Sequence, residues 1–226
     1  MDYVFVARGK QGDGFSNEPS ASHFLAVPDS AADMAYAHKI SKTDWRKAVV
    51  AEASGGTPNP NTAGDIVFFV HGFNNSQATV LARHRKIKAG LAAHGFTGAV
   101  VSFDWPSADS ALNYLEDRVD AKLSALRLVT DGIGTFAAMQ TPDCRIDMHV
   151  LAHSMGCYVV REAFDDADDR ARIAGRSWSV SQVMLLAADL SVDSLNAGHS
   201  KSSSLYRHCV RLTNYYNPLD DVLSIS

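Results

Sequence analysis

A serine set between small residues is the feature of this sequence that most strongly suggests chemistry. The segment MHVLAHSMGCYVV places Ser154 between an apolar run and an apolar helical start, with Ala152 and Gly156 two positions to either side. This pattern is typical of a nucleophile elbow, in which a sharp strand-to-helix turn strains the serine backbone and leaves no room for large flanking residues. Because Ser-x-Gly alone usually marks an ordinary turn, the strand before it and the helix after it carry the prediction that Ser154 is a nucleophile.

A second polar turn follows the apolar run of DIVFFVHGFNNS. His71 and Gly72 end this run, and a glycine there permits a close approach to a substrate carbonyl. We expect the backbone N–H groups of Phe73 and Met155 to form an oxyanion hole for the negative charge that develops during acyl transfer. We interpret His71 as a structural residue that holds the turn, because its strand precedes that of the nucleophile.

An acidic partner is expected after a strand that follows the nucleophile in the chain. The segment CVRLTNYYNPLDDVL offers two adjacent carboxylates, of which we favour Asp220 over Asp221. Asp189, at the end of the apolar run in MLLAADLSVDS, is the reserve candidate, although capping of the following turn explains it at least as well.

The histidine that would act as general base has no obvious position in the sequence. No histidine follows Asp220. His199 lies on a Gly/Ser-rich stretch that could turn inward, His149 lies within a strand, and His153 adjoins the serine. All three fit structural roles better than the role of base. We therefore expect the base beyond Ser226, together with a further strand and helix that would complete the sheet.

Seven short runs rich in Val, Phe and Leu predict strands. These runs are Tyr3–Ala7, His23–Val27, Ile66–Val70, Ala99–Phe103, Met148–Ala152, Val183–Ala187 and Cys209–Leu212. From residue 65 onward they alternate with segments of helical spacing, which predicts a mostly parallel sheet with helices on both faces. The first two runs are joined by GKQGDGFSNEPSAS, which we expect to be a mobile loop between antiparallel strands.

Helical spacing is clearest in three segments. The longest helix is predicted from Ser107 or Asp109 to Phe136. Its apolar stripe is expected to face the sheet and comprises Leu112, Leu115, Val119, Leu123, Leu126, Val129, Ile133 and Phe136. A second helix follows Asn75-Ser76 and stops at Gly95, and a third begins at Ser154. His84 is expected at the surface or at the end of an element.

Composition limits the class of protein. A chain of 226 residues, 46% hydrophobic and 20% charged, suits one domain over residues 1–226, with N-terminal strands and a lead-in helix in 1–64 and a catalytic core in 65–226. A formal charge of −4 and a pI near 6.1 give no general attraction to nucleic acid.

The start of the chain and its cysteines predict a compartment. The sequence shows neither a signal-like start nor a run long enough to span a membrane, and its three cysteines are far apart. We therefore expect a cytoplasmic protein. It has no phosphate-binding glycine motif and no metal-ligand spacing, so no cofactor or metal is expected.

Five segments together resemble the α/β-hydrolase superfamily, and within it the esterase/lipase-like branch of hydrolases of unknown function. They are HGFNNS, FDWPS, NYLEDR, LAHSMG and NYYNPLDDVLSIS, and the resemblance covers roughly residues 65–226. It implies an α/β-hydrolase-type fold and a Ser–Asp–His triad in that chain order, with Ser154 and Asp220 in the first two places. It also implies that neither a metal nor an organic cofactor takes part.

The predicted function is hydrolysis of a carboxylic ester or related acyl substrate through an acyl-enzyme on Ser154. Trp105, Pro106, Leu112 and Tyr114 could form a wall of the acyl pocket, although a place in the core explains them equally well. The alternative is a non-catalytic α/β-hydrolase-like module that binds a ligand or a protein partner with a degenerate triad.

Overall fold

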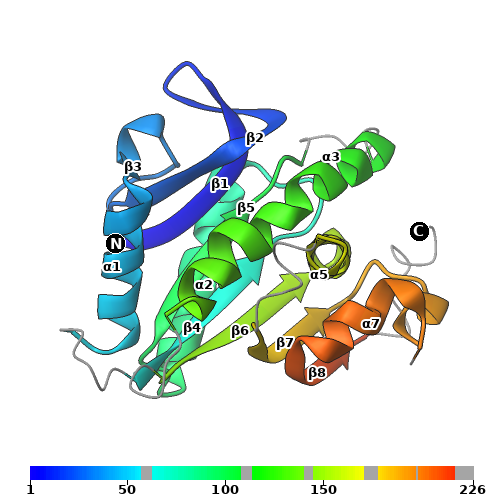
Figure 1. The fold of residues 1–226 in the computed structure, drawn as a ribbon. Helices are drawn as coiled ribbons and strands as arrows, with labels where there is room; N and C mark the ends of the chain where they lie inside the picture. The colour runs from blue at the N-terminus through cyan, green and yellow to red at the C-terminus, as the bar shows by residue number, and fades with distance from the viewer. Residues whose placement is uncertain (57–62, 108–113, 140–144, 171–177, 197, 217–226) are drawn as a thin grey trace.

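A single mixed sheet organises the molecule, in the strand order β3-β2-β1-β5-β4-β6-β7-β8 (Figure 1). The computed structural model describes residues 1–56, 63–107, 114–139, 145–170, 178–196 and 198–216. The strands are β1 (Asp2–Gln11), β2 (Gly14–Val27), β3 (Lys39–Ile40), β4 (Ala63–Val70), β5 (Ala99–Asp104), β6 (Arg145–His153), β7 (Val180–Leu186) and β8 (Cys209–Tyr215). All seven predicted strands are therefore confirmed, and the two-residue β3 is additional.

Helices connect the parallel strands. They are α1 (Lys42–Ala53), α2 (Gln77–Ala93), α3 (Tyr114–Arg127), α4 (Gly134–Ala137), α5 (Met155–Asp168) and α7 (Ser200–Arg207), with the shorter turns η1 (Tyr36–His38), η3 (Leu128–Ile133) and η4 (Val192–Leu195). Neighbouring strands from β1 to β8 in the sheet order pair in parallel, whereas β2 pairs antiparallel with both β1 and β3. This confirms the predicted mostly parallel sheet with antiparallel first strands.

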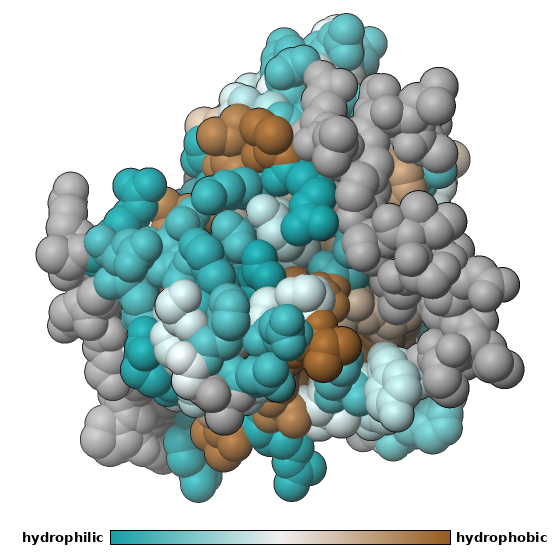
Figure 2. All heavy atoms as spheres, turned by 90° about the vertical axis from the view of Figure 1, so that its right-hand side faces the viewer, coloured by the Kyte–Doolittle hydropathy of each residue, from teal (hydrophilic) through white to brown (hydrophobic). Residues whose placement is uncertain are grey.

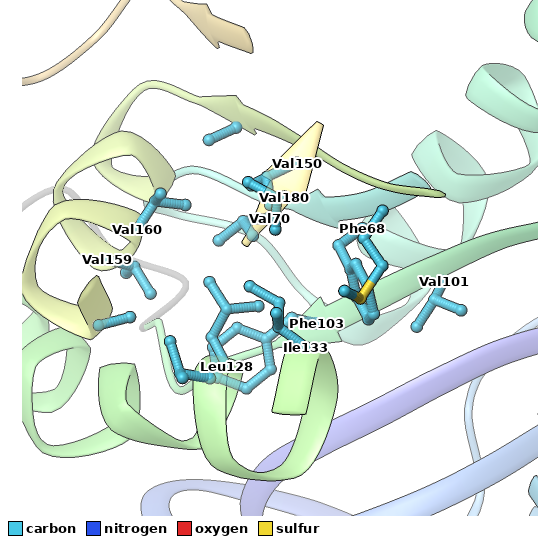
Figure 3. Close-up of a cluster of buried hydrophobic side chains, with 14 of the residues drawn as sticks. Phe68, Val70, Val101, Phe103, Leu128, Ile133, Val150, Val159, Val160 and Val180 are labelled. Atoms are coloured by element: carbon cyan, nitrogen blue, oxygen red, sulfur yellow. The ribbon is translucent and has the colours of Figure 1, made fainter. Parts of the chain in front are cut away.

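The two faces of the sheet bury separate sets of side chains, because successive residues of a strand point to opposite faces. Phe5 of β1 packs into the larger core with α1, α3, α5 and α7, whereas its neighbours Val4 and Val6 pack into a smaller core with Val80 and Leu81 of α2. Figure 3 shows part of the larger core, where strand side chains such as Phe68 and Phe103 lie beside Ile133 of η3. The predicted coverage of both faces by helices is confirmed.

The surface on the side of α7 and β8 is mainly hydrophilic. Figure 2 shows its apolar side chains in separate patches with hydrophilic residues between them. Val192 of η4 and Val210 of β8 are among the exposed apolar side chains of the chain. Among the described residues, none of the helices combines the length and the apolar character that crossing a bilayer requires.

The segment from Gly9 to Ser22 corrects the sequence prediction. We expected a mobile loop, but β1 and β2 continue through it as a two-stranded arm that pairs Gln11 with Gly14. Gly12 turns the chain at φ 57°, a conformation that glycine adopts at little cost. The polar composition reflects exposure of this arm to solvent, since polar residues on a strand can face water without preventing strand pairing.

The long helix also differs from its prediction. Ser107 is not helical, residues 108–113 lie outside the described part, and α3 leads into the π-helical η3 before α4. Val119 and Leu123, which the predicted stripe placed against the sheet, are 58% and 64% exposed, while Ala121 and Ala125 are buried instead. A π-helical turn adds a residue per turn, so it shifts the buried face between α3 and the segment that carries Ile133 and Phe136.

His84 of α2 is a further correction, because it is fully buried rather than at the surface. Its Nδ1 lies 2.8 Å from the hydroxyl of Ser102, and its Nε2 lies 3.5 Å from a carboxylate oxygen of Asp2. Arg85 donates from Nε to the same carboxylate at 2.7 Å. Burial alone would raise the pKa of Asp2, but the hydrogen bonds to His84 and Arg85 outweigh it and lower the pKa to about 2.

The substitution Asp2→Asn should therefore destabilise the fold in a pH-dependent way. A carboxyl pKa of about 2 in the folded state, against 3.8 as the ordinary value, contributes about 2 kcal/mol of stability above pH 4, which is lost as the pH falls toward 2. Urea unfolding should show the wild type more stable at pH 7 and the two proteins converging near pH 2. Asp29→Asn, at an exposed ion pair with the N-terminus, is the control and should change little. A difference between wild type and Asp2→Asn that stays constant with pH would contradict this account.

Candidate active site

Ser154 lies at the turn between β6 and α5, with φ 54° and ψ −126°. Positive φ is unfavourable for a residue with a Cβ, so the surrounding packing must hold this conformation. The Ser154 N–H donates to the carbonyl of Leu186 at 2.9 Å, and the Ser154 carbonyl accepts from Cys157 N–H at 2.9 Å. The strained strand-to-helix turn that the sequence predicts is present at this residue.

Gly156 explains why small residues flank the serine. A Cβ at this position would lie 2.4 Å from the carbonyl oxygen of Val70 and 2.5 Å from that of His71. Both obstacles are backbone atoms, which have little freedom to move aside. Ala152, on the other side of the serine, is fully buried in the larger core, so the alanine is accommodated where the strict pattern has glycine.

The turn after β4 lies directly against the serine. β4 and β6 pair in parallel with Val70 opposite Ala152, so both strands end at the same edge of the sheet. A Cβ added at Gly72 would lie 3.0 Å from the Cβ of Ser154. Phe73 follows this glycine and packs against the larger core, and Met155 is the first residue of α5. Of the two predicted oxyanion-hole residues, Phe73 thus follows the glycine that lies against Ser154, and Met155 follows Ser154 itself.

His71 has the structural role that the sequence analysis assigned to it. It is fully buried, with Nδ1 2.7 Å from the carbonyl oxygen of Gly72 and Nε2 3.1 Å from a carboxylate oxygen of Asp104. The indole of Trp105 stacks on the imidazole with ring centroids 5.3 Å apart, and its Nε1 donates to the His71 carbonyl at 2.8 Å.

Asp104 and Arg8 were not singled out from the sequence. Asp104 ends β5, and its carboxylate accepts from Arg8 Nε at 2.9 Å, with both side chains almost completely buried. Burial would raise the pKa of Asp104, but the charge of Arg8 and the hydrogen bond with His71 outweigh it and lower the pKa. The signal in the sequence was a charged residue at the end of each of two apolar runs, VFVAR and VVSFD.

Of the aspartates considered as the triad acid, the structure describes only Asp189. Asp220 and Asp221 lie outside the described residues. Asp189 follows β7, is 6% exposed, and donates its backbone N–H to the carbonyl of Ser154 at 3.3 Å. Ala187, between β7 and Asp189, has φ 47°, so the chain turns sharply toward the serine.

The histidines weighed as bases have other contacts. His199 caps the start of α7 by accepting from the N–H of Lys201 at 3.2 Å. His149 lies 2.8 Å from the carboxylate of Asp65, and His153 is the last residue of β6. The contacts of His149 and His199 agree with the structural roles expected for them.

The residues proposed for the acyl pocket are only partly described. Trp105 is fully buried and supports His71, a contact that fits the interpretation as core. Tyr114 is the first residue of α3, and Leu112 lies outside the described residues. Within the described ranges, no three His, Cys, Asp or Glu side chains are grouped so that they could hold a metal ion.

Cys157 is the other nucleophilic side chain at the start of α5. Burial raises the pKa of its thiol to about 12, so it stays protonated at neutral pH. Because the thiolate is the reactive form, Cys157 does not compete with Ser154.

A family model described as alpha/beta hydrolase of unknown function (DUF900) matches residues 58–226. The chain belongs to this α/β hydrolase family. No curated protein matches the chain. Both the family and the sheet described above agree with the α/β-hydrolase resemblance of the sequence.

Two solved structures show a distant likeness to this family member. Phospholipase PlaB from Legionella pneumophila is 19% identical with a TM-score of 0.35, and the match covers 55% of this chain and 25% of that one. An acetyl xylan esterase is 12% identical with a TM-score of 0.36, and the match covers 70% of this chain and 88% of that one. The chain thus spans only a quarter of the phospholipase chain.

The close packing at Gly156 gives a test of the elbow. Gly156→Ala should destabilise the fold by several kcal/mol or prevent folding, because its Cβ would overlap two backbone carbonyls of the neighbouring strand. Gly90→Ala in α2 is the matched control, since nothing lies within 4 Å of its added Cβ. This control should stabilise the protein by about 1 kcal/mol through helix propensity. Thermal unfolding of both variants distinguishes the two, and equal stability of Gly156→Ala and wild type would refute the packing described here.

Proposed function

We propose that the protein is a serine hydrolase that cleaves a carboxylic ester or related acyl substrate through an acyl-enzyme on Ser154. The observation that carries the proposal is the strained backbone of Ser154 beside the Gly72 turn. Such a turn exposes the serine hydroxyl at the end of a central strand, next to backbone N–H groups that can bind an oxyanion.

The reaction follows from the roles of these groups. The Ser154 hydroxyl attacks the substrate carbonyl carbon while a histidine base takes its proton. The Phe73 and Met155 N–H groups stabilise the oxyanion of the tetrahedral intermediate. When the intermediate collapses, the bond to the alcohol breaks and the alcohol leaves with the proton from the histidine. Water then attacks the acyl-enzyme, and the acid and free Ser154 are released.

The remaining roles rest on the family resemblance. It places the histidine after Asp220 in chain order and gives Asp220 the task of orienting that histidine. Trp105 and Tyr114 are proposed as the wall of the acyl pocket, and the substrate as a small acyl compound.

Met155 suits the oxyanion role because the first N–H groups of a helix have no carbonyl partner within the helix.

Labelling with a fluorophosphonate tests the nucleophile. The full-length protein should form a stable adduct that Ser154→Ala abolishes, because the probe reacts only with an activated serine. Ser181→Ala, which removes an exposed hydroxyl bound to Asp147, should label like the wild type. Intact-protein mass spectrometry measures the adduct. A folded wild type that stays unlabelled would favour the non-catalytic binding module with a degenerate triad.

A pair of substitutions tests the acid. Asp220→Asn should lower kcat for a p-nitrophenyl ester by about 10³–10⁴-fold, since a triad without its carboxylate loses the correct histidine tautomer. Asp189→Asn should reduce kcat by less than about tenfold, because its backbone contact with Ser154 is retained. The opposite ranking would move the role of triad acid to Asp189.

A further inference from the structure

Three charged or ionisable side chains from three strands form a continuous buried chain under the candidate site. Arg8 of β1, Asp104 at the end of β5 and His71 after β4 are each at most 1% exposed. Arg8 Nε lies 2.9 Å from one Asp104 oxygen, and His71 Nε2 lies 3.1 Å from the other. Burial of charges is costly unless they are paired, so this arrangement needs an explanation beyond packing.

The far end of the chain reaches the Gly72 turn. His71 Nδ1 lies 2.7 Å from the Gly72 carbonyl oxygen, while Nε2 lies 3.1 Å from Asp104 and 3.3 Å from the Trp105 backbone nitrogen, so the ring fills the space between Asp104 and the Gly72 carbonyl. Asn75 Nδ2 donates to the same oxygen at 2.7 Å and to the Phe73 carbonyl at 2.8 Å. The Gly72 carbonyl is therefore in contact with two side chains, the Asn75 amide that donates to it and the His71 ring.

Holding this carbonyl also fixes the adjacent N–H. The peptide between Gly72 and Phe73 is trans and planar, so the Phe73 N–H points opposite to the Gly72 carbonyl. That N–H is the proposed oxyanion donor from this turn. Its direction is thus set by His71 and Asn75 from the side away from the substrate.

Arg8 extends the support to the rest of the turn. Its Nη2 donates to the Asn75 carbonyl at 3.5 Å, its Nη1 donates to the Ser107 carbonyl at 3.4 Å, and Nη1 also binds Asn17 Oδ1 of β2. Arg8 lies outside residues 58–226, the segment that the family model matches. The N-terminal strand therefore contributes a side chain to a turn of the family segment.

We propose that Arg8, Asp104 and His71 act as a positioning relay that holds the Phe73 N–H in the direction required by the oxyanion hole. The inference rests on the proposed serine hydrolase function. Asp104 is the central member, because it alone contacts both other side chains. It neutralises Arg8 and orients the edge of the His71 ring, whose plane is set by stacking on Trp105.

The molecule contains a matched control for this relay. Arg85, Asp2 and His84 form a second Arg–Asp–His cluster, in which Asp2 and His84 are buried and Arg85 is 33% exposed. It joins β1 to α2, and the contacts described for it above do not reach the Gly72 turn. Asp2→Asn and Asp104→Asn each remove one buried carboxylate that contacts an arginine and a histidine. General destabilisation should be common to both variants, and only a positioning effect should separate them.

The experiment compares the two variants in the full-length protein. Asp104→Asn should lower kcat for a p-nitrophenyl ester by about 10–100-fold with KM changed less than threefold, a smaller loss than deletion of an oxyanion donor. Asp2→Asn should keep kcat within twofold. Hydrogen exchange of the backbone amides of residues 71–76 should accelerate at least tenfold in Asp104→Asn and not in Asp2→Asn. This measurement does not depend on catalytic activity.

The results separate failure of the proposed relay from failure of the proposed hydrolase function. If Asp104→Asn matches Asp2→Asn in kcat and in exchange of residues 71–76, the relay is overturned, although Ser154 labelling would still stand. If the wild type neither labels nor hydrolyses esters, the proposed function fails and the exchange comparison alone decides whether the relay orders the turn.

If Asp104→Asn does not fold, Arg8→Lys replaces it, keeping the charge while losing the Nη contacts. Arg8→Lys should show the same kcat and exchange changes in smaller degree, and a wild-type result would refute the relay.

Discussion

The parallel pairing of β4 with β6 is the constraint on which the candidate site depends. Parallel strands end at the same edge of a sheet, so the turn after β4 and the serine after β6 must meet there. The meeting is close enough that Gly156 has backbone carbonyls of β4 and its turn where a Cβ would lie. The geometry of the site thus depends on close packing of the backbone, which is possible because the residues around Ser154 are small.

Burial of carboxylates is the second organising principle, and two buried carboxylates, Asp2 and Asp104, lie on β1 or pair with one of its side chains. Asp2 at the start of this strand faces α2, while Arg8 further along it faces the turn beside Ser154. β1 lies between β2 and β5 in the sheet rather than at an edge, so its side chains reach both neighbours and both faces. The N-terminal strands are therefore integrated with the family segment through charge as well as through the core.

Local patterns predicted the elements well where one physical signal dominated. The seven apolar runs became strands because each supplies a buried face, and Gly95 ends α2 with φ 85°, as a left-handed cap requires. The prediction failed where the local signal was ambiguous. The polar segment 9–22 continues β1 and β2 around a turn because strand pairing needs only backbone groups. The stripe predicted for the long helix does not keep one phase through the π-helical η3, so Val119 and Leu123 are exposed whereas Ile133 and Phe136 are buried.

The sequence by itself determined the strand–serine–helix turn, the glycine after β4 and the family, because these depend on residue types at short, regular spacing. The positions of Asp220 and of the general base remain predictions of that kind. Only the tertiary structure showed that His84 is buried and that Arg8 meets Asp104, 96 residues away, beneath the turn that holds Gly72. The physical reason is that two buried charges pair when the sheet places their strands side by side. The order of strands in a sheet depends on contacts between distant segments, which the spacing of residues along the chain does not reveal.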